Sequence, residues 1–274
     1  MKLKFIFPIL FVLLICSCNH ELEIDWSKNN DRVFLVNSCT DYFFNLTENF
    51  PTNSKGSCGY VAACSLFAYY DLFFDENLVE DKYQLRNKKS FGLKHINLSD
   101  VETLNNAEYY NFLKLNQDEY LMAKLIVSSN ERFLTDSGKT ILYATNSKNP
   151  MELYDGAESR FIDNDCEVQV IMNYYLHELK GFQTDYICAK QLPANRDVII
   201  KKIQEGVPVL VSVKNGYGTG HICIIYDYDE IEDELYAHLL MQPEYNESRL
   251  YNHIKLSSFY KKMKYPVYIE IEKQ

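Results

Sequence analysis

Cys58, at the start of an apolar run, is the residue of this chain best placed to act as a nucleophile. The seven residues before it, 51–57, are turn formers and helix caps, and the run that follows predicts a buried helix. Ser57 is a natural N-cap, which puts Cys58 in the first turn. Because unpaired backbone N–H groups and the helix dipole favour a thiolate there, we expect a lowered pKa for Cys58. It should then be alkylated near neutral pH before Cys64 or Cys223.

A cysteine nucleophile needs a base, and His221 is the candidate. Residues 202–213 indicate the end of a helix, a glycine stop and a strand, and a glycine-rich loop follows at 215–220. His221 opens the next apolar strand, 163 residues after Cys58. Taken alone, His221 is better explained as a hydrogen-bonded core histidine. Paired with Cys58, it becomes the expected base.

Three segments resemble a known family: 56–63 (Gly-Ser-Cys-Gly-Tyr-Val-Ala-Ala), 206–209 (Gly-Val-Pro-Val) and 220–225 (Gly-His-Ile-Cys-Ile-Ile). They look like the papain-like cysteine peptidases, in the branch similar to bacterial double-glycine, bacteriocin-processing peptidases. The resemblance covers residues 51–71 and 198–270. It implies an α+β fold in which a helical lobe carrying the Cys58 helix packs against an antiparallel, twisted sheet carrying His221. It also implies a peptide or protein substrate, and this chemistry needs no cofactor.

Two further site residues follow from the resemblance. The family places an Asn or Asp roughly 15 to 20 residues after the catalytic His to orient its ring, and here that place falls at His238. The family's Gln, six residues before the Cys, is replaced by Thr52 with Asn53 beside it, so the Asn53 amide and the Cys58 N–H become the oxyanion donors. The alternatives are that His238 is an exposed strand residue and that Asn53 is an ordinary turn residue.

The expected reaction is attack by the Cys58 thiolate on a peptide carbonyl, an acyl-enzyme, and deacylation by water that His221 activates. Two alternatives stay open. An amidase or transferase acting on non-peptide amides uses the same chemistry, and a catalytically inactive surface lipoprotein would keep the fold for binding. The sequence leaves the oligomeric state open as well.

The amino terminus predicts export. Residues 1–4 are basic, and residues 5–15 form an apolar core that is too short for a transmembrane helix. Residues 15–18 (Ile-Cys-Ser-Cys) resemble a bacterial lipobox, which makes Cys18 the site of lipid attachment and anchors the protein to a membrane of the cell envelope. Ordinary secretion after cleavage nearby is the alternative. We therefore divide the chain into a leader (1–17), a tether (18–44) and a peptidase domain (45–274).

Charge and cysteine content exclude several classes of protein. The chain has a formal net charge of −10, and removal of the two leader lysines leaves −12, which argues against a nucleic-acid partner. Outside the leader, the spacing of Cys and His does not match a structural zinc site, and no metal is expected. A dense disulfide framework is not expected either, although a Cys166–Cys188 pair stays open.

Hydrophobic periodicity predicts the elements that must position the site. The expected helices begin at Cys58, run through residues 118–126 and 165–177, and cover 196–204. The expected strands are 208–213, 221–228, 234–240 and 265–272. Residues 76–108 are charged and rich in Asn, and we expect them to be the least ordered part of the domain.

Overall fold

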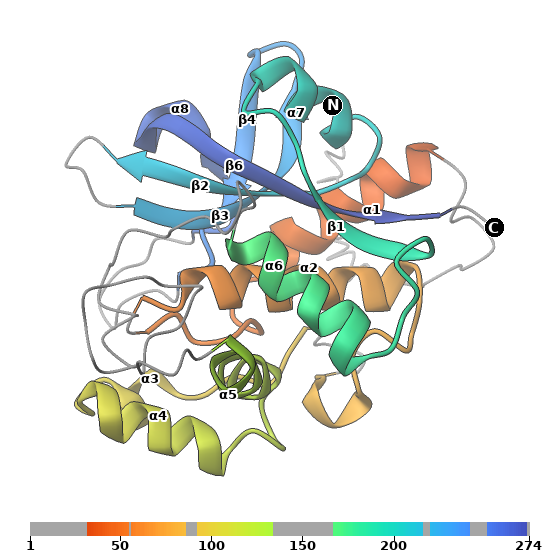
Figure 1. The fold of residues 1–274 in the computed structure, drawn as a ribbon. Coiled ribbons are helices and arrows are strands. Elements are labelled where there is room, and N and C mark those ends of the chain that lie inside the picture. Colours follow the sequence, from red (N-terminus) through yellow and green to blue (C-terminus); the bar gives the residue numbers. More distant parts are fainter. Residues whose placement is uncertain are drawn as a thin grey trace, which may run out of the picture.

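The chain is described here as a computed structural model, in which residues 32–54, 56–85, 92–133, 167–215, 220–241 and 251–272 are placed. Helices from the N-terminal part pack against a six-stranded antiparallel sheet (Figure 1). This arrangement confirms the expected α+β class, with the Cys58 helix in the helical part and His221 in the sheet. The helices are α1 (Arg32–Asn45), α2 (Cys58–Phe73), the 3-10 turn η2 (Asp81–Tyr83), α3 (Leu98–Val101), α4 (Asn106–Leu115), α5 (Leu121–Phe133), α6 (Glu167–Asn173), its π-helical continuation η4 (Tyr174–Leu179), α7 (Arg196–Ile203) and α8 (Leu256–Phe259).

The sheet has the strand order β1-β6-β2-β3-β4-β5, and every neighbouring pair is antiparallel. The strands are β1 (Ile187–Gln191), β2 (Val209–Asn215), β3 (Gly220–Asp229), β4 (Glu234–His238), β5 (Ile254–Lys255) and β6 (Tyr260–Ile271). The four predicted strands and the helices predicted from Cys58, in 165–177 and in 196–204 are confirmed with small shifts of their ends. The helix expected around 118–126 is α5, which starts and ends later.

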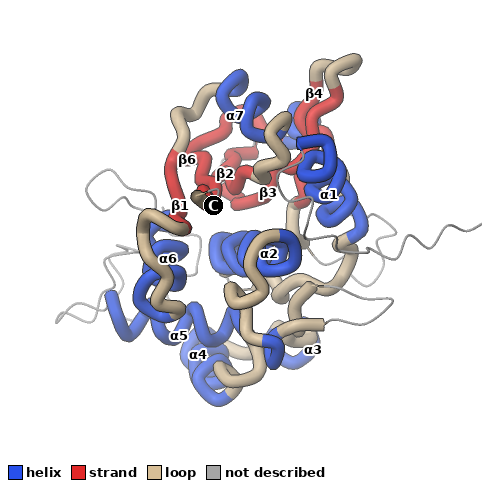
Figure 2. The backbone as a smooth tube through the Cα atoms, turned by 90° about the vertical axis from the view of Figure 1, so that its right-hand side faces the viewer, coloured by secondary structure: helices blue, strands red, loops and turns tan. Residues whose placement is uncertain are grey.

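Two hydrophobic clusters cover the two faces of the sheet. Side chains alternate along β3, so Ile224 and Tyr226 join the large cluster around α2, whereas Cys223 and Ile225 join a smaller cluster under α7. Figure 2 shows the strands between α7 on one side and α2, α6 and α5 on the other. The sheet is therefore buried on both faces, and a functional group on it becomes accessible mainly at strand ends.

The first described helix corrects the predicted tether. α1 begins at Arg32, well inside the segment 18–44 that the sequence indicated as a linker. Tyr42 and Phe43 are buried in the large cluster, and the centroid of the Phe43 ring lies 5.5 Å from the centroid of the Tyr226 ring on β3. Burial of two such rings stabilises the fold by a few kcal/mol. Because α1 supplies these rings to the core, it is an integral part of the domain.

Residues 76–108 hold more structure than their composition suggests. They include η2 and α3 and the start of α4, whose N-cap Asn105 forms a reciprocal capping box with Glu108. The carboxylate of Asp71 on α2 is fully buried and accepts hydrogen bonds from the Val79 N–H and the Gln84 side chain. Hydrogen bonds to backbone groups and helix caps hold this segment in place, and a search for hydrophobic periodicity does not detect such contacts. Within the described ranges, no helix is both long enough and apolar enough to cross a bilayer.

Candidate active site

The turn before α2 delivers Cys58 as the first residue of the helix. Two hydrogen bonds between Ser54 and Ser57 stabilise this turn. The Ser57 N–H donates to the Ser54 carbonyl (3.1 Å), and the Ser54 N–H donates to the Ser57 hydroxyl (3.2 Å). Gly56 has a φ of +76°, a conformation that glycine adopts without strain. Ser57 is the N-cap residue as predicted, but its hydroxyl holds the turn and does not bond to a helix N–H.

The Cys58 thiol lies among backbone N–H groups, yet its pKa is raised. Burial is the dominant cause, and hydrogen bonds from the N–H groups of Ile222, Gly59 and Cys58 itself lower the pKa only in part. The prediction of a depressed pKa is therefore wrong for this conformation. A helix N-terminus favours the thiolate, but the loss of solvation outweighs that preference, so the resting group is a thiol.

The His221 imidazole has a defined tautomer. Its Nε2 lies 2.6 Å from the carbonyl oxygen of Leu239. A carbonyl can only accept, so Nε2 carries the proton and, in the neutral ring, Nδ1 is the unprotonated nitrogen. Burial lowers the pKa of His221, although the Leu239 carbonyl partly offsets this effect by stabilising the cation. His221 is therefore a neutral ring at neutral pH, in the form that can accept a proton.

Cys58 and His221 come from distant parts of the sequence, and the start of α2 contacts the start of β3. The Cys58 sulfur accepts the N–H of Ile222, the residue after His221. β4 pairs with β3 only as far as Ile224, opposite His238, which leaves the beginning of β3 beyond the end of β4. Among the described residues, no hydrogen bond links the Cys58 thiol to the His221 ring, whose recorded partner is Leu239.

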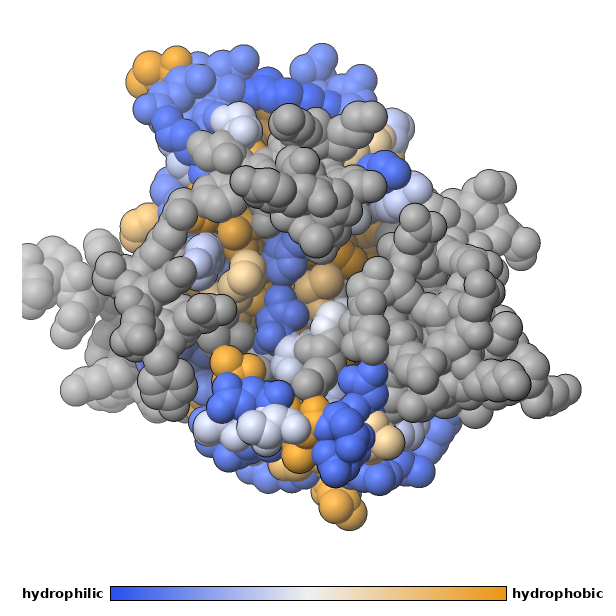
Figure 3. Space-filling model, turned by 90° about the vertical axis from the view of Figure 1, so that its left-hand side faces the viewer, coloured by the Kyte–Doolittle hydropathy of each residue, from blue (hydrophilic) through white to orange (hydrophobic). Residues whose placement is uncertain are grey.

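The start of α2, the end of β2 and the start of β3 all lie on the left side of the molecule in Figure 1. Seen from that side, the surface is hollowed between the sheet and the helices below it (Figure 3). Hydrophilic side chains run along the middle of the hollow, with hydrophobic ones beside them. The two candidate catalytic residues therefore lie on the side of the molecule that has this hollow.

The contacts of His238 differ from the predicted ones. His238 is buried, with 1% of its surface exposed. Its Nε2 contacts the Leu46 carbonyl, and its Nδ1 accepts the Leu240 N–H at 2.9 Å. Both ring nitrogens are occupied, so His238 does not hydrogen-bond His221 here, and the Leu239 carbonyl fills the orienting place. The physical reason is register, because His238 pairs with Ile224, three residues along β3 from His221.

Asn53 lies in the same region. Its side-chain amide donates to the Leu240 carbonyl at 3.5 Å, a long contact, so the amide is held at the end of β4. Asn53 is thus near the groups that hold His221, and its predicted role as an oxyanion donor stays a prediction.

The remaining cysteine predictions divide between the described and undescribed parts. Cys18 and Cys166 lie outside the described residues. Cys188 is a free thiol, as are Cys39, Cys64 and Cys223. Within the described ranges, no cluster of three or more His, Cys, Asp or Glu residues has the arrangement of a metal site.

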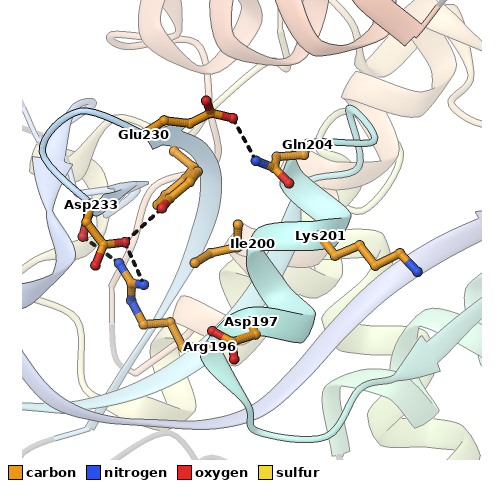
Figure 4. Close-up of a pocket in the computed structure, with 8 residues that line it drawn as sticks. Arg196, Asp197, Ile200, Lys201, Gln204, Glu230 and Asp233 are labelled. Atoms are coloured by element: carbon orange, nitrogen blue, oxygen red, sulfur yellow. Dashed lines mark hydrogen bonds and ion pairs between the residues drawn. The ribbon is translucent and has the colours of Figure 1, made fainter.

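An open cavity of about 560 Å³ lies elsewhere, between α7 and the β3–β4 hairpin. Figure 4 shows Asp233 facing Arg196 and Glu230 facing Gln204, whereas the Lys201 side chain points away from them. Asp233 pairs with Arg196 and accepts the Tyr228 hydroxyl, and Gln204 donates to Glu230. Because these groups satisfy each other at an exposed surface, this cavity does not compete with the Cys58 region as a reaction site.

The contributions that sequence reasoning missed come from the main chain. The Ile222 N–H contacts Cys58, the Leu239 carbonyl contacts His221, and the Leu240 carbonyl contacts Asn53. Every residue has such backbone groups, so residue types in the sequence do not reveal these contacts.

Comparison with protein-family models, with curated proteins and with solved structures finds no match for this chain.

Proposed function

We propose that this protein is a cysteine peptidase with a papain-like arrangement, in which Cys58 is the nucleophile and His221 the base. One observation carries the proposal. The sulfur of the first residue of α2 accepts the N–H of Ile222, so Cys58 lies next to the residue that follows His221, although 163 positions separate Cys58 from His221 in the chain. The α+β architecture, with the nucleophile helix packed against an antiparallel sheet, supports it further.

The neutral pair sets the order of proton movements. His221 Nδ1 takes the thiol proton as the sulfur attacks the substrate carbonyl, and it then gives that proton to the leaving amine. Water attacks the resulting thioester with His221 again as base, and the carboxylic acid departs as the thiol is restored. Transfer requires Nδ1 to approach the sulfur, and hydrogen bonds of this kind often tighten only when substrate binds.

The surroundings of the sulfur supply electrostatic stabilisation. The N–H groups of Ile222, Gly59 and Cys58 point at the developing thiolate and lower its energy without charged side chains. The Cys58 N–H and the Asn53 amide are the proposed donors to the oxyanion. Peptide bonds are the proposed substrate, and amide hydrolysis or transfer on non-peptide substrates follows the same steps.

The decisive experiment is turnover of a peptide library by the purified full chain, read by mass spectrometry. Cys58→Ala is expected to abolish cleavage, because no other group can form the thioester. His221→Ala should lower kcat by roughly 10² to 10⁴, the usual contribution of a general base. Cys64→Ala is the matched control on the same helix, and it should cleave at the wild-type rate because Cys64 is buried and inert.

A second function, binding by a catalytically inactive member of the same fold, is favoured by specific observations. The Cys58 pKa is raised, and the recorded partner of the His221 ring is Leu239. Side-chain alternation also assigns His221 to the face of β3 that carries Cys223, opposite to α2. Folded wild-type protein that cleaves no library peptide would overturn the peptidase proposal in favour of this one, whereas a Cys58→Ala variant that cleaves as well as wild type would overturn the assignment of Cys58 as the nucleophile.

A further inference from the structure

Two consecutive carbonyl groups after β4 hold the proposed site from one side. The Leu239 carbonyl accepts from His221 Nε2 at 2.6 Å, and the Leu240 carbonyl accepts from the Asn53 amide at 3.5 Å. The first contact sets the tautomer of the proposed base, and the second tethers the turn that precedes Cys58. The short segment 238–240 therefore connects the two halves of the site.

This segment needs to be held, because Leu240 has a φ of +52°. A side chain other than glycine in this left-handed region costs about 1–2 kcal/mol. The strained residue lets successive carbonyls point to different partners, whereas an extended strand would send them into a sheet ladder. Such a conformation persists only where the surroundings enforce it.

The His238 ring supplies that enforcement. Its Nδ1 accepts the N–H of the strained Leu240 at 2.9 Å, and its Nε2 contacts the Leu46 carbonyl beyond the end of α1. The ring packs edge-on against Phe50, with centroids 5.2 Å apart and planes at 81°, and is almost fully buried. Nδ1 must be unprotonated to accept an N–H, so the neutral ring donates through Nε2.

We propose that His238 is a positioning residue that fixes the Leu239–Leu240 turn, and through it the tautomer and orientation of His221. The inference rests on the proposed function in assigning His221 as the base, and it extends that function to a residue that touches neither the substrate nor the base. His238 acts through the backbone. Its hydrogen bond with the Leu240 N–H fixes the orientation of the turn, and the turn in turn directs the Leu239 carbonyl towards Nε2 of His221.

Two substitutions separate the contacts of His238. His238→Asn places its amide oxygen near the position of Nδ1 and keeps an acceptor for the Leu240 N–H. His238→Gln reaches the position of Nε2 and keeps the contact with Leu46. Each variant removes one hydrogen bond from the same buried site, so the two should lose comparable stability. His253→Gln, a histidine held between Tyr226 and Tyr236, controls for loss of a ring elsewhere.

The measurement is the ¹⁵N chemical shift pattern of the His221 ring in the full chain, together with kcat and KM. Wild type and His238→Asn should show His221 protonated at Nε2, and His238→Gln should show a mixture of tautomers. The kcat of His238→Gln should fall about tenfold to a hundredfold below that of His238→Asn with KM unchanged, since misplaced catalytic groups cost rates of this order.

The tautomer measurement does not depend on turnover, so it tests the inference even if the wild-type chain cleaves nothing and the peptidase proposal fails. Equal tautomer patterns in folded Asn and Gln variants would overturn the positioning role, whatever the loss of stability. A His253→Gln variant that disturbs the His221 tautomer as strongly as His238→Gln would overturn it too, because the effect would then be general.

Discussion

At the scale of single residues, the Cys58–His221 pair is neutral at rest. Burial raises the pKa of the Cys58 thiol and lowers the pKa of the His221 imidazole, so at neutral pH the first is a thiol and the second an uncharged ring. An ion pair preformed at rest would need each shift to have the opposite sign. The proposed catalysis therefore requires proton transfer from Cys58 to His221 during attack, when the substrate displaces water from the site.

The rate of alkylation of Cys58 by iodoacetamide should rise about tenfold per pH unit from pH 7 to 9 without a plateau, because only the thiolate reacts and the folded-state pKa lies above 9.0. Cys58 should still react before Cys64 and Cys223, which are fully buried. Mass spectrometry of partially labelled protein measures both effects. A plateau at or below neutral pH would instead reveal a thiolate–imidazolium pair.

At the scale of elements, α1 is the part that composition misrepresented. Its polar and aromatic residues suit a linker, but its contacts bind it to β3. The Cys39 thiol lies 3.7 Å from the Tyr226 carbonyl, and the Phe43 ring packs near Tyr226 and Tyr69. The end of α1 leads to Leu46, whose carbonyl contacts His238, so the position of α1 is linked to the site.

Two adjacent phenylalanines test this role of α1. Phe43→Ala should lower the free energy of unfolding by about 3–5 kcal/mol, because the ring is fully buried and its removal leaves a cavity. Phe44→Ala should change it by no more than about 0.5 kcal/mol, because 47% of Phe44 is exposed. Denaturant unfolding of the two variants measures the difference. Equal, small effects would mean that α1 is a dispensable tether after all.

At the scale of the whole molecule, we propose that the leader directs export of this protein to the cell envelope. We propose that residues 1–17 are removed and that Cys18 carries diacylglycerol. Acyl chains hold a protein on a membrane through burial of their apolar groups, so a formal charge of −12 on the remaining chain does not oppose anchoring.

This proposal predicts partitioning. Wild-type protein made in a bacterial host should enter the detergent phase and stay with membranes through high salt, because charge plays no part in its retention. Cys18→Ser should become soluble or keep its leader, which fractionation and intact-mass measurement distinguish. An unlipidated amino terminus at another residue in the wild type would make this a secreted protein and leave the fold and site unaffected.

Local signals in the sequence were sufficient to predict the start of α2 at Cys58 and the strand that opens near His221, whereas the α+β class was predicted from the family resemblance. Turn formers, caps and apolar runs act over a few residues, so residue types report them directly. The partners of His238 and His221, the charge state of Cys58 and the docking of α1 depended on tertiary structure. Each is decided by groups that are distant in the chain. The Leu239 carbonyl contacts the His221 ring, and the Leu46 carbonyl contacts the His238 ring. Burial raises the pKa of Cys58 more than the helix N-terminus lowers it, and β3 provides the surface that α1 covers.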